Sequence, residues 1–231
     1  MKYLIIIFKT IINIKNNRKN LKDVKKNIIT YIIACILLYG FSAFIGIICR
    51  FAKPIIYLYP TKKEKVKVKV KYPEKLICTY PKYEDNWEVV ANPNGELEDC
   101  KTGRKLYALY WEGKRDDKPR IDKGFCIRGE DSIKFLEEKL AQLGLNERES
   151  EEFIVYWLPK LEKNKYNLIK FELTEDINKH MSLDITPIPD TLIRINMVFK
   201  KSSKSIEIEP QEIITPERNG FTVVEWGGTE I

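Results

Sequence analysis

Three hydrophobic patterns follow one another along the chain: a continuous apolar run, alternating positions and helical repeats. The continuous run covers residues 27–49, which are 23 positions without Asp, Glu, Lys or Arg. A bilayer core of about 30 Å needs about 20 such residues in a helix. A cleaved signal peptide would have a shorter apolar core and an A-x-A-like site, and the run has neither feature. The pattern therefore predicts one retained transmembrane helix, a signal anchor, over 27–49.

Alternation with period two dominates the chain after this run. From Lys65 to Tyr72, Val66, Val68 and Val70 share one face and the lysines share the other, as in a strand with one buried side. Short β-branched or aromatic runs between turn signals predict further strands at 55–59, 76–80, 87–91, 106–111, 125–128, 166–173, 191–200, 205–209 and 220–226.

A helical period of three and four residues appears in the middle of the chain. The first such segment has apolar residues at Ile133, Leu136, Leu140 and Leu143. A second helix is predicted from Asn146, with Glu149 completing a capping-box pattern, and Pro159 should kink it or end its first segment. Residues 54–231 are thus predicted to form an α+β domain, a mostly antiparallel, sandwich-like sheet with two inserted helices.

The distribution of basic residues predicts the orientation of the span. Residues 1–53 carry ten Lys and Arg against one Asp, and most of the basic residues lie in the segment 1–26. Because the more basic flank tends to stay in the cytoplasm, we expect the N-terminus inside and the domain outside. Arg50 and Lys53 follow the span at once, so the reverse orientation stays open. The basic segment could also contact anionic lipid head groups, or it could only set the topology.

The same distribution argues against a nucleic-acid partner. The chain has a net charge of +7, but the 178 residues after Lys53 hold 30 basic and 32 acidic groups. A near-neutral domain lacks the basic patch that neutralises phosphates. The expected partners are the lipid bilayer and, at the cell envelope, anionic head groups or a cell-wall polymer.

Common catalytic and metal-binding patterns are missing from the sequence. His180 is the one histidine, and no G-x-S-x-G occurs. The distal cysteines Cys78, Cys100 and Cys126 are too widely spaced for a zinc motif, so we expect no metal and no cofactor. The cysteines are interpreted as small buried residues, or as one disulfide of unknown pairing with a free thiol.

Two acids beside tryptophans could carry glycan chemistry. Glu112 follows Trp111, and Glu225 precedes Trp226, each near a predicted strand end. A glycosidase needs two carboxylates about 5–10 Å apart and aromatic planes on which sugars stack. We favour the alternative that these acids bind the backbone or pair with Arg194 or Arg128.

A noncatalytic surface is the other candidate site. The chain contains 12 tyrosines and 4 tryptophans, which could bind cell-wall glycan by stacking, although most are expected in the core. Lys65, Lys67 and Lys69 could contact teichoic acid or lipid head groups. We favour the view that they form the charged side of an edge strand.

Several motifs resemble one known family. They are K-P-I-I-Y-L-Y-P at 53–60, T-Y-P-K-Y at 79–83, W-E-G at 111–113, F-I-V-Y-W-L-P-K at 153–160 and G-F-T-V-V-E-W-G-G at 220–228. The family, marked by K-P-x-I-Y-L-Y-P and V-E-W-G-G, consists of uncharacterised bacterial membrane-anchored or exported proteins. The resemblance implies an extracytoplasmic domain and a Gram-positive or AT-rich bacterial source, and it supplies no catalytic residues.

Taken together, these patterns lead us to expect a single-pass membrane protein that presents a binding or interaction domain at the cell envelope. The alternative is a membrane-tethered glycan hydrolase that uses Glu112 and Glu225.

Overall fold

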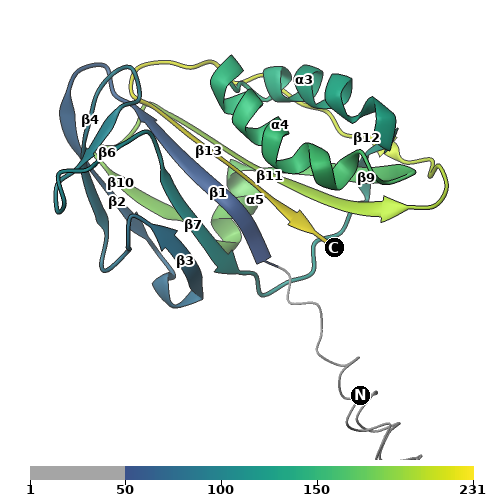
Figure 1. Ribbon diagram of the computed structural model, residues 1–231, viewed down its shortest axis with the longest axis horizontal. Coiled ribbons are helices and arrows are strands. Elements are labelled where there is room, and N and C mark those ends of the chain that lie inside the picture. Colours follow the sequence, from purple (N-terminus) through teal and green to yellow (C-terminus); the bar gives the residue numbers. More distant parts are fainter. Residues whose placement is uncertain (1–49) are drawn as a thin grey trace, which may run out of the picture. The chain divides into compact units, whose positions relative to one another are not determined.

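Two β-sheets and three α-helices make up the part of the chain that the computed structural model describes, residues 50–231 (Figure 1). The predicted span 27–49 and the basic segment 1–26 lie outside the described residues. Among residues 50–231, no helix is long and apolar enough to cross a bilayer.

The larger sheet has eight strands. In spatial order they are β12 (Glu209–Pro210), β8 (Lys123–Arg128), β9 (Tyr166–Leu173), β11 (Thr191–Ser202), β13 (Thr222–Glu230), β1 (Arg50–Tyr59), β7 (Leu109–Lys114) and β3 (Leu76–Tyr80). The smaller sheet has five strands, in the order β10 (Leu183–Thr186), β2 (Glu64–Val70), β4 (Trp87–Ala91), β5 (Leu97–Asp99) and β6 (Lys105–Leu106).

The helices are α3 (Ser132–Gln142), α4 (Glu147–Leu161) and α5 (Thr174–His180), and two short 3₁₀ turns lie at η1 (Pro73–Lys75) and η2 (Gly129–Asp131). Most strand pairs are antiparallel, but β11–β13 and β12–β8 are parallel. The predicted α+β class is confirmed, with a mixed rather than purely antiparallel large sheet and with three helices instead of two in the described region.

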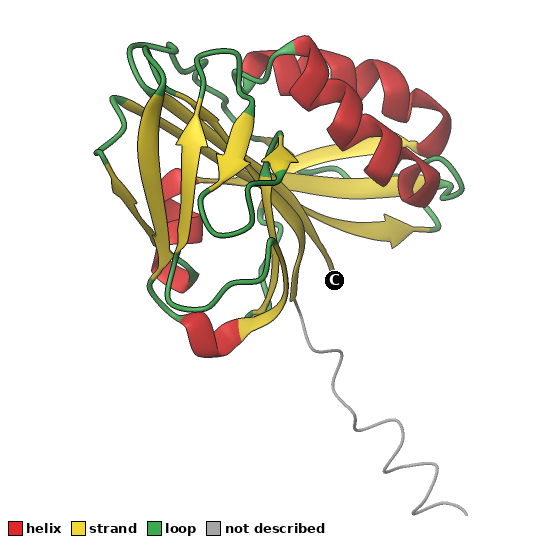
Figure 2. Cartoon of the chain, turned by 60° about the vertical axis from the view of Figure 1, so that its left-hand side comes forward, coloured by secondary structure: helices red, strands yellow, loops and turns green. Residues whose placement is uncertain are grey.

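Successive residues of the central strand β1 pack into two different hydrophobic cores. In β1, Ile56 and Leu58 face the small sheet and pack with Val66, Val68 and Trp111. Ile55 and Tyr57 face the other way and pack with residues of α3, α4, β11 and β13. The large sheet therefore separates a core shared by two sheets from a core covered by two helices, which lie together on one side of it (Figure 2).

The second predicted helix begins as expected. The Asn146 side chain accepts a hydrogen bond from the Glu149 backbone N–H (2.9 Å), and the Glu149 carboxylate accepts one from the Asn146 N–H (2.8 Å). These two bonds form the predicted capping box. The helix continues through Pro159 to Leu161, so Pro159 does not end it. Proline removes the bond to the Val155 carbonyl, and Val155 lies on the water-facing side of α4, where solvent can bind that group.

Three other expectations about elements were wrong. The predicted strand 205–209 is reduced to β12, which has only two residues. Helix α5 and strands β5 and β10 were not predicted. The lysine-rich strand β2 is not an edge strand, because β10 and β4 pair with its two sides.

Candidate functional site

Glu225 lies in the core between the sheets and not at an open surface. Its side chain is 3% exposed and forms an ion pair with Arg194, whose Nε lies 2.5 Å from the Glu225 Oε2. The Trp111 indole N–H donates to the other carboxylate oxygen at 2.7 Å. Both oxygens thus have a donor, and the pairing with Arg194 expected in the structural interpretation is confirmed.

Glu112 lies on the opposite face of the same sheet. Glu225 and Leu109 are both in register with Ile56 of β1, and these three residues belong to the face toward the small sheet. Tyr110 is in register with Ile55 on the helix side, and Glu112, two residues later in β7, shares that face. The structure therefore does not bring the two candidate catalytic acids together around one substrate.

The two candidate tryptophans are buried as well. Trp111 and Trp226 are both 0% exposed. Trp226 donates its indole N–H to the Tyr57 hydroxyl at 3.1 Å. Neither ring can stack on a sugar without unfolding its surroundings.

Tyrosines, rather than tryptophans, form the exposed aromatic surface of the described region. We call tyrosine face the group Tyr80, Tyr107, Tyr110 and Tyr156 together with Glu112. Tyr80 and Tyr110 are cross-strand neighbours in β3 and β7. Tyr80 is 49% exposed and Tyr107 is 47% exposed, while Tyr110, Tyr156 and Glu112 are half-buried.

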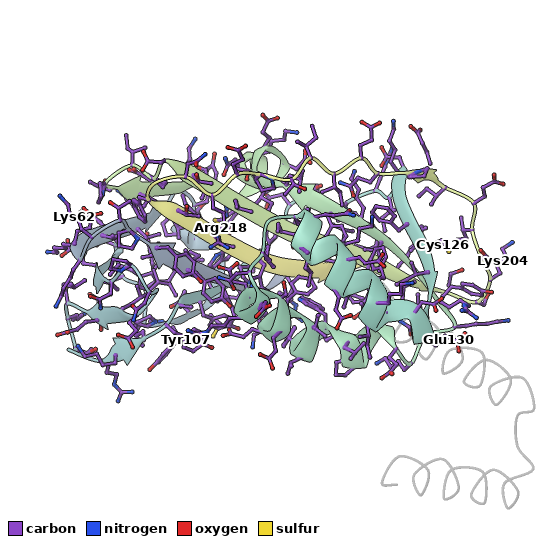
Figure 3. The ribbon with its side chains drawn as sticks, turned by 90° about the horizontal axis from the view of Figure 1, so that it is seen from above. Lys62, Tyr107, Cys126, Glu130, Lys204 and Arg218 are labelled. Atoms are coloured by element: carbon purple, nitrogen blue, oxygen red, sulfur yellow. The ribbon has the colours of Figure 1, made fainter. Side chains whose placement is uncertain are left out.

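One side of α4 forms the wall of this face. Arg148, Glu152 and Tyr156 follow at intervals of four residues and so share one side of the helix. The Arg148 guanidinium lies 4.8 Å from the centre of the Tyr107 ring and pairs with Glu152 at 3.1 Å. Tyr107 is labelled in Figure 3, which views the molecule from above.

Further contacts join Tyr107, Glu152 and Tyr156 to Tyr57 and Lys53 of β1. The buried Tyr57 hydroxyl donates to Glu152 at 2.8 Å, and the Tyr57 and Tyr107 ring centres are 6.4 Å apart. The Lys53 ammonium lies 4.7 Å from the centre of the Tyr156 ring. Tyr80, Tyr110 and Tyr156 lie on β3, β7 and α4, whereas Tyr107 lies in the bend between β6 and β7.

The surroundings of Tyr107, Tyr110 and Tyr156 favour the neutral form of their hydroxyl groups, which raises their pKa. Burial and the Glu112 carboxylate raise the pKa of the hydroxyls of Tyr110 and Tyr156. Burial, with a smaller contribution from Glu152, also raises the pKa of Tyr107. At physiological pH these three tyrosines therefore present intact hydroxyl groups, which can both donate and accept hydrogen bonds.

The lysine row on β2 is interleaved with acids. Lys65 pairs with Glu88 of β4 at 2.6 Å. Lys67 lies opposite Glu88, and Lys69 lies opposite Asp184 of β10. Of the three candidate lysines, Lys65 forms an ion pair in the described region, and Glu88 and Asp184 lie beside the other two.

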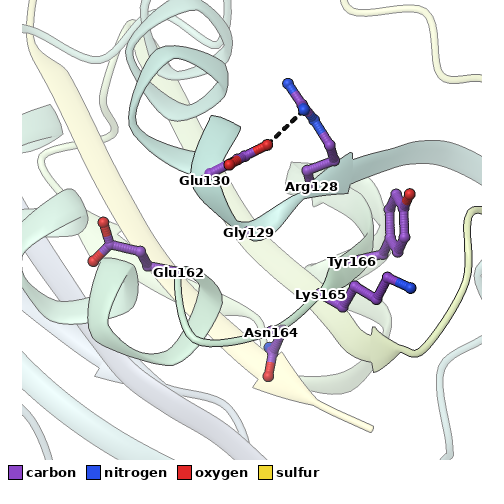
Figure 4. A pocket seen from close by; sticks show the side chains of 7 residues that line it. All are labelled: Arg128, Gly129, Glu130, Glu162, Asn164, Lys165 and Tyr166. Carbon is purple, nitrogen blue, oxygen red and sulfur yellow. Dashed lines mark ion pairs between the residues drawn. The ribbon is translucent and has the colours of Figure 1, made fainter.

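Two hollows occur elsewhere on the described surface. One, of about 340 Å³, is lined by Arg128, Glu130, Lys165, Tyr166 and their neighbours, and its Arg128–Glu130 ion pair measures 2.5 Å (Figure 4). The other, of about 390 Å³, lies around Trp87, Lys101 and Cys100. Some of their charged side chains pair with one another or with a neighbour, as Lys101 does with Glu84 and Arg128 with Asp131.

The candidate thiols and metal ligands are dispersed. Cys78, Cys100 and Cys126 are free thiols. Cys78 and Cys100 are exposed, although buried cysteines or a disulfide were expected. Within residues 50–231, no group of three or more His, Cys, Asp or Glu side chains could hold a metal ion. His180 lies at the end of α5, with its Nδ1 3.4 Å from Asp117.

Sequence reasoning placed Glu112 in the candidate site but missed the tyrosines around it. Tyr110 and Glu112 alternate with Leu109 and Trp111, so period two could have shown that they share a face. No local pattern relates Tyr156 to Glu112, because α4 and β7 meet only in the folded domain.

Comparison of the chain with known protein families, with curated proteins and with solved structures gives no match.

Proposed function

We propose that this protein is a single-pass envelope protein whose C-terminal domain binds a cell-wall glycan through the tyrosine face. The predicted span 27–49 would anchor the domain, and the basic segment 1–26 would hold the N-terminus in the cytoplasm. The domain would then face the wall polymers outside.

The observation that carries the proposal is the group of tyrosines, two of them exposed and two half-buried, on the face of the sheet that carries Glu112. Sugar rings present apolar C–H faces and polar hydroxyl edges, and tyrosine offers both an apolar ring and a polar hydroxyl. Tyr80 and Tyr107 supply accessible rings. Glu112 and Arg148 belong to the same surface and supply polar groups that can hydrogen-bond to sugar hydroxyls. A surface with several aromatic rings suits an extended polymer, whose successive units can contact different rings.

Binding without cleavage follows from the placement of the acids. Glycoside hydrolysis uses two carboxylates that flank one bond. Glu112 stands on the tyrosine face, whereas Glu225 is buried on the other side of the sheet with Arg194. We therefore prefer a binding domain to the hydrolase considered from the sequence.

Co-sedimentation of the detergent-solubilised full chain with insoluble purified cell-wall glycan tests the proposal. We expect the wild type to sediment and the double variant Tyr80→Ala, Tyr107→Ala to bind at least about tenfold more weakly, which corresponds to about 1.4 kcal/mol. Tyr166→Ala is the matched control, because Tyr166 is a partly exposed tyrosine at the separate hollow of Figure 4.

Equal binding by the double variant, or no sedimentation of the wild type, would contradict the proposal. Release of soluble sugar by the wild type would instead favour the hydrolase.

A further inference from the structure

Strand β1 contains a bulge near its beginning. Ala52 of β1 pairs with Gly228 of β13. Ile55 pairs with Trp226, so β1 has one residue more than β13 between the two pairs. The register with β7 shifts over the same part of β1. Since a bulge takes a side chain out of the regular alternation and re-aims it, the direction of Lys53 is set by this irregularity.

Lys53 has an unfavourable backbone conformation in the bulge. Its φ of 54° is the one positive value among the non-glycine residues of the described region. A residue with a Cβ is strained at this φ, and the following Pro54 restricts Lys53 further. Glycine is the usual residue at such a position of a bulge. Because backbone strain gathers at functional sites, the lysine points to a use of its side chain.

Two lysine side chains meet at the ring of Tyr156, a member of the tyrosine face. The Lys53 ammonium lies 4.7 Å from the centre of this ring, and the Lys160 ammonium lies 4.9 Å from it. Lys160 belongs to the last turn of α4 and also lies 4.6 Å from the centre of the Trp157 ring. Strand β1 and helix α4 thus bring together two positive charges that are far apart in the sequence.

The positive charge around Tyr156 is only partly compensated. Among the ion pairs of residues 50–231, none includes Lys53, Lys160, Arg50 or Glu112. Burial and Glu112 raise the pKa of the Tyr156 hydroxyl, whereas Arg50 lowers it, so both of these charges act on the same group. Three basic side chains and one carboxylate leave an excess of positive charge here.

We propose that Lys53 and Lys160 form an anion subsite of the tyrosine face, which binds the carboxylates of an acidic wall glycan. The inference rests on the proposed glycan binding and names the class of glycan. Both lysines are half-buried, and their flexible side chains place a compact charge beside a ligand. A neutral glycan would leave both ammonium groups without a counter-charge. A lipid head group would make no use of the neighbouring tyrosine rings.

The affinities for two tetrasaccharides with the same backbone test the inference. Chitotetraose is neutral, whereas the tetrasaccharide of alternating N-acetylglucosamine and N-acetylmuramic acid carries free carboxylates on the same backbone. The full chain in phosphatidylcholine nanodiscs is titrated with each, and the ratio of the two dissociation constants is the readout. We expect the wild type to bind the acidic fragment about fivefold more tightly at low salt. This preference should disappear at high salt, which screens partly exposed charges.

Lys53→Gly separates the role of the charge from that of the fold. Glycine relieves the positive φ, so the unfolding temperature should stay unchanged or rise. The preference for the acidic fragment should fall below about twofold in this variant and in Lys160→Gln. The matched control is Lys165→Gln, because Lys165 is an exposed lysine at the separate hollow of Figure 4. We expect this control to keep the full preference.

Equal affinity of the wild type for both fragments would overturn the inference and leave glycan binding intact. Binding of neither fragment would overturn both proposals. A preference that survives both lysine variants, or a clear fall in the unfolding temperature of Lys53→Gly, would also contradict the anion subsite. A preference that is lost in phosphatidylglycerol nanodiscs would assign the two lysines to lipid head groups and would overturn their assignment to the glycan.

Discussion

Hydrogen bonds to both of its oxygens give Glu225 a structural role in the domain. Trp111 and Arg194 are its donors, and the Arg194 Nη1 also donates to Asn178 and to the Met181 carbonyl, each at 2.6 Å. Among the described residues, the buried Nη2 of Arg194 has no hydrogen-bond partner. The carboxylate is therefore the main compensation for a guanidinium that is 0% exposed.

Replacing Glu225 by Gln should lower the stability of the domain. The amide keeps an acceptor for Trp111, but it removes the charge opposite Arg194, and breaking a buried pair costs about 3–5 kcal/mol. Urea unfolding of the wild type and the variant measures this loss. Glu112→Gln is the control, and we expect its stability to change by less than about 0.5 kcal/mol. A Glu225→Gln variant as stable as the wild type would contradict the structural role.

Tyr57 gives a second prediction, on alkaline stability. Burial and the hydrogen bond to Glu152 raise the pKa of its hydroxyl above the ordinary value. Since the folded state holds the neutral form, this contribution is fully present below about pH 10 and is lost as the pH rises further. We expect wild-type stability to fall above pH 10 and the fall to be shallower in Tyr57→Phe.

The same variant should be less stable at neutral pH. Phenylalanine leaves the Trp226 indole N–H and the Glu152 carboxylate without the Tyr57 hydroxyl, at a cost of about 1–3 kcal/mol. Thermal unfolding between pH 7 and pH 11 measures both effects. Identical pH profiles for the wild type and Tyr57→Phe would contradict this account of the hydroxyl.

At the scale of elements, the capping box determines where α4 begins. Glu149 is fully buried, completes the box and also accepts two hydrogen bonds from Arg218, at 2.9 and 3.0 Å. The start of the helix is thereby tied to the segment before β13. Arg218 in turn lies 5.0 Å from the centre of the Tyr59 ring in β1.

Asn146→Ala should cost about 1 kcal/mol of stability, because it leaves the Glu149 backbone N–H without its cap. The exposed Gln142→Ala in α3 is the control and should change stability by less than about 0.5 kcal/mol. Chemical unfolding that shows no difference between the two variants would mean that the cap does not stabilise α4.

Elements with a clear apolar pattern between turn signals were predictable from the sequence, and elements without such a pattern were not. Strands 76–80, 87–91 and 166–173 agree with the structure at both ends. Helix α5 was missed because it has seven residues, one buried apolar side chain (Ile177) and no turn signal after β9. The assignment of β2 to an edge failed because strand order depends on contacts between distant segments, and its neighbour β10 was not predicted.

The candidate functional site, too, could be predicted only in part from the sequence. Alternation in β7 separates Glu112 from Trp111, but the burial of Trp111 and Glu225 depends on which sheet covers each face. The contacts of Tyr107 with Arg148 and Tyr57 join segments about 40 and 50 residues apart. The sequence could therefore indicate an aromatic surface, but it could not identify its members.

At the scale of the whole molecule, the proposed anchor makes a prediction about topology. Single cysteines replacing Lys204 and Asn17, in a chain without other cysteines, report the two sides of the membrane. An impermeant maleimide applied to intact cells should label the Lys204 position and miss the Asn17 position, because the denser basic flank precedes the span. The reverse pattern would overturn the orientation, and labelling of both positions would overturn the span.

Glycan binding by the tyrosine face is the central claim, and fluorine NMR with 3-fluorotyrosine tests it most directly. Tyr→Phe variants assign the signals of the 12 tyrosines. On titration with a soluble cell-wall glycan fragment, we predict shifts for Tyr80, Tyr107, Tyr110 and Tyr156 and none for Tyr83 or Tyr166. Unchanged spectra at saturating fragment, or shifts confined to tyrosines outside the face, would contradict the account.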